Sequence, residues 1–468
     1  MKHLIRYLLK EYNYLKTGDY PTSEKLNQLR QQQWLNQEAL HALQTERLKT
    51  MLLHAHQHAP YYRPLLEKAD VVDSTGVVHL ENYSKLPLLD KAILRKEFER
   101  LKSDDLGTRQ WKEKKSGGST GEPATVIFDQ ERKDWLRALN SLRNEWTGFP
   151  SDAPRLYIIG SERDLFVGQE TFKVRFLRWA YNQVWLNAFK MSKEKMAEYV
   201  EIVNRFKPVQ IHAYNDCLYE FAKYIDHRGL RVHHPQSIVL VSGVVTPDMR
   251  NVIERVFHAP IFNRYGSREI GGIAMECDQH AGLHISSPLL YAEIVRPDGT
   301  PTAPGEIGEI ILTPFFNYAM PLLRYRIGDM GAWAESPCSC GRSWPLLQNV
   351  AGRVPDVFLR RDGSIVPPQY FVYLTGIVLD GSWSRKFQII QEDYERIRVL
   401  VLLSEPTPDP YSAYAHHLSE LIQKIKVVMG ETCDVQIEFV DDIPPLPSGK
   451  FRYTICKIHQ DAQPNASC

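Results

Sequence analysis

Apolar residues recur at helical intervals in the first part of the chain. Within residues 26–66, side chains such as Leu43, Leu48 and Leu52 stand four or five positions apart, with charged residues between them. This spacing gathers them on one face of an α-helix. Proline lacks a backbone N–H and disfavours helical geometry in the preceding residue, so we expect this helix to end before Pro60.

Short apolar runs alternate with helical patterns in the middle of the chain. Residues 155–160 and 237–243 are typical of buried strands that end in a Gly or Ser turn, whereas residues 193–206 and 216–229 have the spacing of amphipathic helices. Strand and helix in alternation predict an α/β sheet with its ligand-binding loops at the strand ends.

The pattern changes toward the C-terminus. A β-rich stretch runs from Gly305 to about Gly352, and beyond it a small α+β unit is expected. Its elements are two strands, a helix and a third strand at 386–391, 396–403, 411–430 and 433–440. We therefore predict a large α/β domain over residues 1–352, with layered α/β subdomains and a small β-rich subdomain, and a small α+β domain over 353–468.

Composition narrows the classes of function. The 468 residues are 43% hydrophobic and 24% charged, and their formal net charge is +1. This balance gives no reason to expect nucleic acid or an anionic membrane as a partner. The first ten residues lack the features of a secretory signal, and no window approaches the roughly 20 apolar residues of a membrane span. Seven mostly isolated cysteines are typical of reduced thiols, so we expect a cytoplasmic protein. We further expect a monomer or a homodimer.

A Gly- and Ser-rich stretch, KKSGGSTGEP, covers residues 114–123. Taken alone it fits either a surface turn or a loop whose backbone N–H groups hold a phosphate. A kinase-type phosphate loop is a poor match, because Glu122 stands where that motif requires a lysine.

Four later stretches of the sequence help to interpret this loop. They are YGSREIGG (265–272), LLRYRIGD (322–329), GRVPD (352–356) and LPSGKFRY (446–453). Their order and content resemble the adenylate-forming superfamily of ATP-dependent ligases. The match is closest to the phenylacetate-CoA ligase branch, and within it to the capsular-polysaccharide (CapK-like) proteins and the deazaflavin-adenylating synthetases.

The resemblance implies a site for ATP and Mg²⁺. Glu269 would be the Mg²⁺ ligand, since Mg²⁺ takes one or two carboxylates together with substrate phosphates. Lys450, on the small domain, would neutralise charge in the adenylation transition state, with Thr120 beside the phosphates. Asp356 would be the pivot about which the small domain moves. The nucleotide-binding residues implied are Ser116, Gly117, Gly118, Ser119, Thr120, Gly121, Tyr265, Gly266, Ser267, Asp329 and Arg353.

The acid substrate is expected near residues 212–216, 242–246 and 263–267. Arg268 is either an exposed cation or a contact with a negatively charged substrate. Arg326 is explained equally well by an ordinary salt bridge. The polar residues here favour an acid more polar than a bare phenyl ring, although some of them could face the core. The predicted substrate-binding residues are His212, Tyr214, Asn215, Ser242, Gly243 and Arg268.

We separately expect a group of cysteine and histidine side chains that could bind a metal ion. The resemblance brings residues 276–284 next to residues 338–340, and Cys277, His284, Cys338 and Cys340 would then suit tetrahedral Zn²⁺. His280 is a substitute ligand. The alternative is a group of reduced thiols without metal.

The resulting prediction is an enzyme that forms an acyl-AMP and pyrophosphate from a small-molecule carboxylate and then passes the acyl group to an acceptor. That acceptor is coenzyme A, as in an aryl-CoA ligase, or an amine, as in surface-polysaccharide assembly. Two alternatives remain: a coenzyme-adenylating synthetase that leaves AMP on its product, and a nucleotide-binding scaffold without turnover.

Overall fold

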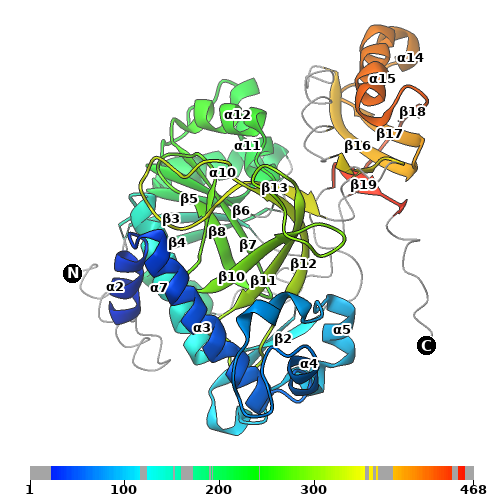
Figure 1. Ribbon diagram of the computed structural model, residues 1–468. Helices are drawn as coiled ribbons and strands as arrows, with labels where there is room; N and C mark the ends of the chain where they lie inside the picture. The colour runs from blue at the N-terminus through cyan, green and yellow to red at the C-terminus, as the bar shows by residue number, and fades with distance from the viewer. Residues whose placement is uncertain are drawn as a thin grey trace.

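The structure is a computed structural model, shown in Figure 1. It describes residues 23–115, 124–150, 153–159, 172–188, 191, 193–241, 243–353, 358–361, 365–366, 371, 383–444 and 452–458.

Helices open the described chain. The Asn36 side chain accepts a hydrogen bond from the Ala39 N–H and so caps the long helix α3, which ends before Pro60 as its sequence predicts. Pro64 then stands in the first turn of α4, where a proline costs no hydrogen bond. The elements of this part are α2 (Ser23–Gln32), α3 (Gln37–His58), α4 (Arg63–Lys68), η1 (Leu80–Lys85), α5 (Lys91–Lys96), α6 (Phe98–Leu101) and η2 (Leu106–Thr108).

A sheet of eleven strands forms the centre of the molecule, and one half of it is parallel. This half has the order β4-β3-β5-β6-β7, so the carboxyl ends of its strands meet at one edge, where α/β proteins bind ligands. Its strands are β3 (Arg155–Ile159), β4 (Gln183–Asn187), β5 (Gln210–Tyr214), β6 (Ser237–Val241) and β7 (Ile261–Ser267). Its helices are α7 (Gln130–Trp146), α9 (Phe172–Ala180), α10 (Lys193–Phe206), α11 (Asn215–His227) and α12 (Pro247–Phe257).

The other half of the sheet is antiparallel and continues from β7 without a break. The β-rich part expected from Gly305 onward therefore begins earlier, because β8 to β10 already belong to it. Its strands are β8 (Gly271–Glu276), β9 (Leu283–Ile285), β10 (Leu290–Val295), β11 (Gly308–Pro314), β12 (Tyr325–Trp333) and β13 (Leu346–Arg353). A separate hairpin pairs β1 (Trp111–Lys115) with β2 (Thr125–Asp129) on either side of the Gly-rich stretch.

A second lobe near the C-terminus has its own sheet, with strand order β18-β17-β16-β19, and its own apolar core. The two strands, helix and third strand predicted from the sequence are all present, and β19 adds a short parallel strand. The elements are β14 (Phe358–Leu359), β15 (Ile365–Val366), β16 (Ser384–Asp393), β17 (Arg396–Leu403), α14 (Pro410–Ala413), α15 (Ala415–Met429), β18 (Asp434–Phe439) and β19 (Thr454–Cys456).

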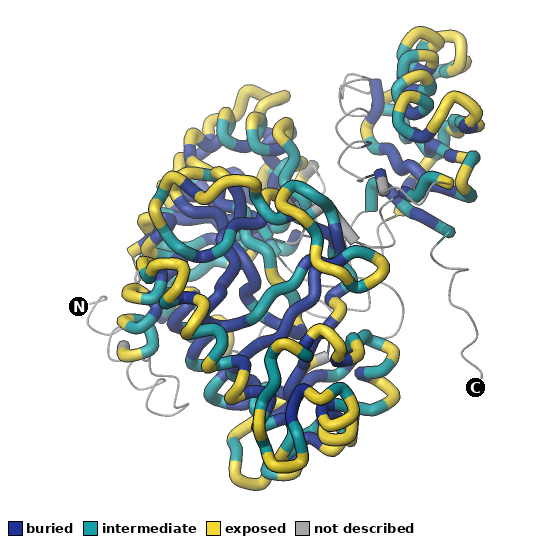
Figure 2. Tube along the Cα trace, in the orientation of Figure 1, coloured by how far each residue is buried: buried dark blue, intermediate teal, exposed yellow. Residues whose placement is uncertain are grey.

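Burial follows these layers. Figure 2 shows the buried chain running through the central sheet, with exposed residues on the outer surfaces of the helices. Among the helices that the structure describes, none combines the length and the apolar character that a membrane crossing requires.

Candidate active site

The hairpin between β7 and β8 carries the YGSREIGG motif. A Cβ on Gly266 would lie 2.5 Å from the Gly271 carbonyl oxygen, and Gly271 has a φ of +93°. The Ile270 N–H donates to Ser267 Oγ at 3.0 Å. The small residues of the motif are thus required by a tight turn, which fixes the position of Glu269 within it.

Two predicted nucleotide-binding residues meet across the sheet. The Tyr265 hydroxyl donates to Asp329 Oδ2 at 2.7 Å, although the two residues are 64 positions apart. Asp329 on β12 also stands opposite Arg353 on β13 in the strand register. The backbones of residues from three different motifs therefore lie close together, and their nucleotide-binding roles stay predictions.

Glu269 is buried, with 5% of its surface exposed. Its carboxylate lies 3.5 Å from Lys91 Nζ at the start of α5, and Arg132 Nη2 donates to its carbonyl oxygen at 2.9 Å. A carboxylate held in this way suits a hard cation that is shared with phosphates. Lys91 stands outside every motif, so no sequence signal pointed to it.

Positive charge gathers around this turn. Burial lowers the pKa of Lys114, at the end of β1, and the nearby charges of Arg132 and Arg268 lower it further. Burial lowers the pKa of Arg132 to about 9, against the opposing effect of Asp129 and Glu269, so this guanidinium stays charged at neutral pH. Arg268 is exposed beside the other two. Three cations where the Gly-rich stretch begins would suit the phosphates of a nucleotide.

Some predicted residues lie outside the described part of the chain, and their roles stay predictions. These residues are Ser116, Gly117, Gly118, Ser119, Thr120, Gly121, Ser242, Asp356 and Lys450.

A cavity of about 190 Å³ lies between α7 and the sheet, and His212 lines it. His212 Nε2 is 2.9 Å from Gln210 Oε1 on the same strand. Three arginines, Arg143, Arg155 and Arg264, line the same cavity. Sequence reasoning placed Arg264 only within a stretch expected near the acid, and it missed the other two.

The other predicted substrate residues have positions away from this cavity lining. Asn215 Nδ2 donates to the Val244 carbonyl at 2.8 Å, and a Cβ on Gly243 would come within 2.4 Å of that same nitrogen. Gly243 therefore serves the close packing of Asn215 against its loop. Tyr214 is the N-cap residue of α11. Arg326 forms an ion pair with Glu309 at 2.6 Å, in agreement with its interpretation as an ordinary salt-bridge residue.

The four predicted metal ligands converge. One ligand atom from each of Cys277, His284, Cys338 and Cys340 lies within 4.8 Å of the others. The Sγ atoms of Cys277 and Cys338 are 3.6 Å apart, and His284 Nε2 is 3.4 Å from Cys340 Sγ. With Zn–S bonds of about 2.3 Å, two sulfurs of a tetrahedron are separated by about 3.7 Å, so the donor set fits Zn²⁺.

Neighbouring groups support this cluster. The His284 Nδ1–H donates to the Trp344 carbonyl at 2.9 Å, which leaves the Nε2 lone pair free to bind a metal. Backbone N–H groups of Gln279 and Arg342 point at the sulfurs of Cys277 and Cys340, at 3.4 Å each. The substitute ligand His280 pairs instead with Glu276, at 3.2 Å.

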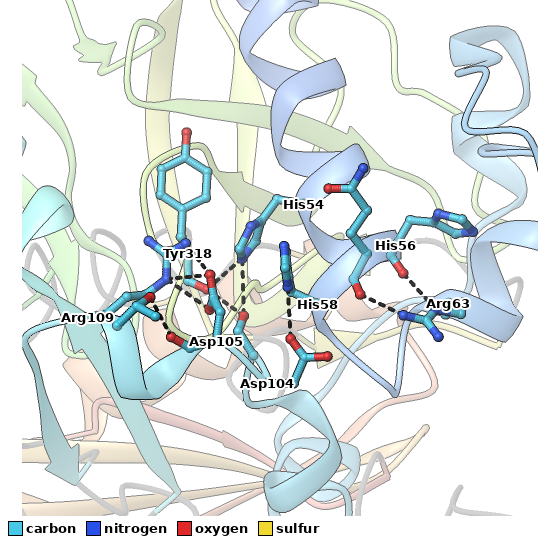
Figure 3. Close-up of polar contacts among 11 residues, drawn as sticks. His54, His56, His58, Arg63, Asp104, Asp105, Arg109 and Tyr318 are labelled. Carbon is cyan, nitrogen blue, oxygen red and sulfur yellow. Dashed lines mark hydrogen bonds and ion pairs between the residues drawn. The ribbon is translucent and has the colours of Figure 1, made fainter.

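A second group, His54, His58 and Asp105, also brings its ligand atoms within 4.8 Å of one another. Figure 3 shows that protein partners already engage these side chains. His54 Nε2 lies 2.8 Å from the Tyr318 carbonyl, His58 pairs with Asp104 at 2.8 Å, and Asp105 pairs with Arg109 at 2.5 Å. The Arg109 hydrogen bond lowers the pKa of Asp105. A polar network that joins helices explains this group without a metal.

Comparisons with known proteins agree with the family resemblance. Residues 358–457 match the family model described as the CapK C-terminal domain. The chain is 24% identical over 434 residues to Protein CapK of Staphylococcus aureus, covering 90% of each chain. It is 26% identical over 447 residues to the phenylacetate-coenzyme A ligase of Thermus thermophilus, covering 89% of this chain and 96% of that one.

The fold is that of a solved ligase. A crystal structure of 2-hydroxyisobutyryl-CoA ligase, in the postadenylation state in complex with R3-HIB-AMP, matches with a TM-score of 0.69 and 18% identity, over 90% of this chain and 91% of that one. The chain is thus similar in sequence to CapK and to phenylacetate-coenzyme A ligases, and similar in fold to a CoA ligase, which agrees with the family resemblance of its motifs.

Proposed function

We propose that the protein activates a carboxylic acid with Mg²⁺·ATP. An oxygen of the acid would attack the α-phosphorus, the bond to the β-phosphate oxygen would break, and acyl-AMP and pyrophosphate would form. A nucleophile would then attack the acyl carbon and release AMP. Adenylation gives the acid a good leaving group, which the second step requires.

One observation carries this proposal: residues from separate motifs converge on a single place. Tyr265 donates to Asp329 at 2.7 Å, and Glu269 follows Tyr265 by four residues in the same hairpin. A scaffold protein that had lost turnover would have no need for a buried carboxylate beside Lys91, because an unneeded buried charge costs stability.

Each side chain would have its own task. Asp329 would accept hydrogen bonds from the ribose hydroxyls, and Tyr265 would hold that carboxylate in place. Glu269 would bind Mg²⁺, which supplies charge neutralisation to the phosphates when bound. Lys114, Arg132 and Arg268 would add positive charge beside the triphosphate, and Lys450 would act from the small domain at residues 353–468.

For the second step we propose coenzyme A as acceptor. The supporting observation is that relatives matched over most of this chain are phenylacetate-coenzyme A ligases. An amine acceptor, and with it a place in surface-polysaccharide assembly, is the alternative outcome of the same experiment.

The test is carboxylate-dependent exchange of labelled pyrophosphate into ATP over a panel of acids, followed by product analysis with coenzyme A or amines. Asp329→Asn should raise the KM for ATP about tenfold or more, and Lys450→Ala should abolish exchange while ATP still binds. Arg296→Gln, which changes a partly exposed arginine paired with Glu306, is the control and should have no effect. Exchange that survives in Lys450→Ala would overturn the role of that lysine.

We also propose that Cys277, His284, Cys338 and Cys340 bind one structural Zn²⁺. The bound metal would join the turn after β8, strand β9 and the loop before β13, and so would add folding energy. Elemental analysis should find one zinc per chain, and Cys338→Ser should lose the metal and lower the melting temperature. Cys433→Ser changes a buried cysteine in the second lobe and is the matched control. Purified protein that folds normally without zinc would reject this site.

A further inference from the structure

The cavity between α7 and the central sheet contains an unusual excess of positive charge. Arg143 comes from α7, Arg155 from β3 and Arg264 from β7, and all three line a space of about 190 Å³. No carboxylate is among the described residues that line this space. The lining is otherwise polar at Asn140, Asn144 and Tyr157.

Arg143 is the most deeply buried of the three, with 2% of its surface exposed. Its Nη2 donates to Ser286 Oγ at 2.8 Å, whereas Nε and Nη1 have no hydrogen-bond partner. A Cβ on Gly272 would come within 2.3 Å of Nη1, so the glycine leaves space for the guanidinium. Buried nitrogen donors without partners are rare in folded proteins, and here they border a cavity.

The other two arginines are oriented by neutral groups. Arg155 donates to Asn144 Oδ1 at 2.8 Å and stacks over the Phe149 ring at 3.9 Å, while its Nε has no partner. Arg264 donates to Asn140 Oδ1 at 2.8 Å. Asparagine oxygens fix the direction of each guanidinium without cancelling its charge.

This arrangement is costly without a counter-ion. Burial lowers the pKa of Arg143 well below its ordinary value, and Arg264 lowers it further. Burial and then Arg155 and Arg264 likewise lower the pKa of His212, so this imidazole is neutral. A negatively charged group in the cavity would supply the missing charge and the missing acceptors.

The cavity lies close to the proposed adenylation site. Gly272, which contacts Arg143, follows Glu269 by three residues on the same hairpin, and Arg264 directly precedes Tyr265. Helix α7 links the two places, since Arg132 at its start holds the Glu269 carbonyl and Arg143 near its end reaches the cavity. An acid whose carboxylate is activated near Glu269 could extend its far end into this space.

We propose that the acid substrate carries a second negatively charged group, and that Arg143, Arg155 and Arg264 bind it. The inference rests on the proposed carboxylate activation and names its substrate class: a dicarboxylate, or a carboxylate with a phosphoryl group. Either group offers several oxygen acceptors to planar guanidinium donors. A monoacid with an apolar ring would leave the three charges uncompensated.

The experiment compares probes that differ only at the far end. Glutarate is matched with glutaramate, its monoamide; 4-phosphonobutanoate tests the phosphoryl arm, and phenylacetate the apolar arm. Calorimetric binding is measured beside pyrophosphate exchange, for the full chain and for Arg264→Gln, Arg264→Lys and Arg155→Gln. Arg296→Gln is again the control.

We expect glutarate or 4-phosphonobutanoate to bind about ten- to a hundredfold more tightly than glutaramate, because each lost charged hydrogen bond costs about 1.5–3 kcal/mol. Arg264→Gln and Arg155→Gln should remove most of this preference, and Arg264→Lys should keep part of it. The KM for ATP should not change.

The outcomes separate the two proposals. Dianion binding without exchange with any acid would support the cavity assignment and contradict carboxylate activation. Exchange with phenylacetate, together with equal binding of glutarate and glutaramate, would support activation and overturn the second charge. Absence of dianion binding to the wild-type chain would also overturn it.

Discussion

Two regions of the large domain each bury an arginine, and the two side chains differ in how completely their hydrogen bonds and charge are satisfied. Arg324, 4% exposed, forms an ion pair with Glu293 at 2.9 Å and donates to the Leu86 carbonyl at 2.8 Å and to the Ser84 carbonyl. Arg143, 2% exposed, has one hydroxyl partner and two unsatisfied nitrogens.

This difference in partners distinguishes a buried charge that stabilises the fold from one that we assign to ligand binding. The Arg324 guanidinium holds η1 against β10, and every one of its nitrogens has an acceptor. A folded protein gains from such a pair only as long as both partners remain. The Arg143 guanidinium holds little in place and lies beside empty space, so its cost is better explained by a ligand than by the fold.

The largest effect should come from breaking the paired arginine. Arg324→Met would leave the Glu293 carboxylate buried and alone, and we expect the free energy of unfolding to fall by about 3–5 kcal/mol. Urea denaturation followed by circular dichroism measures this. Adding Glu293→Leu to the same chain should recover most of the loss, and a single variant as stable as the wild type would show that the pair contributes nothing.

At Arg143 we expect a smaller effect on stability and a larger effect on ligand binding. Arg143→Met removes an uncompensated charge, so the free energy of unfolding should change by less than about 1 kcal/mol or rise. Binding of glutarate should be lost in the same variant. If Arg143→Met unfolds the protein as severely as Arg324→Met does, the distinction between the two regions is wrong.

The contrast also shows what the sequence could reveal. Apolar spacing predicted α10 over residues 193–206, the end of α3 before Pro60 and the strands β3 and β6, because these signals are local. The motif residues Tyr265, Asp329 and Arg353 were found through resemblance, and the structure brings them together. The short strand β19 has only three residues, too few for a periodic signal.

The cationic cavity could not be predicted in this way. Arg143 lies on α7 among other charged residues, and nothing in its local pattern separates a buried arginine from an exposed one. What makes it unusual is the approach of Gly272 and Ser286, more than a hundred positions away, together with two other arginines. Long-range packing creates this property, so a single sequence does not carry it as a motif.

The last prediction concerns the pH dependence of stability at His212. Because burial, Arg155 and Arg264 hold the pKa of His212 well below its unfolded value of about 6.5, the unfolded chain binds the proton more readily. The stabilisation is therefore complete above pH 7 and decreases as the pH falls below about 6.5. Between pH 7.5 and 5.5 we expect His212→Gln to lose about 1 kcal/mol less stability than the wild type in urea denaturation, since its side chain does not titrate. Glutarate should reduce the loss in the wild type, because its charge offsets the two arginines. Equal losses of stability in both proteins without ligand would mean that His212 has the same pKa in the folded and unfolded states. The cavity would then lack the positive potential that distinguishes it from the Arg324 region.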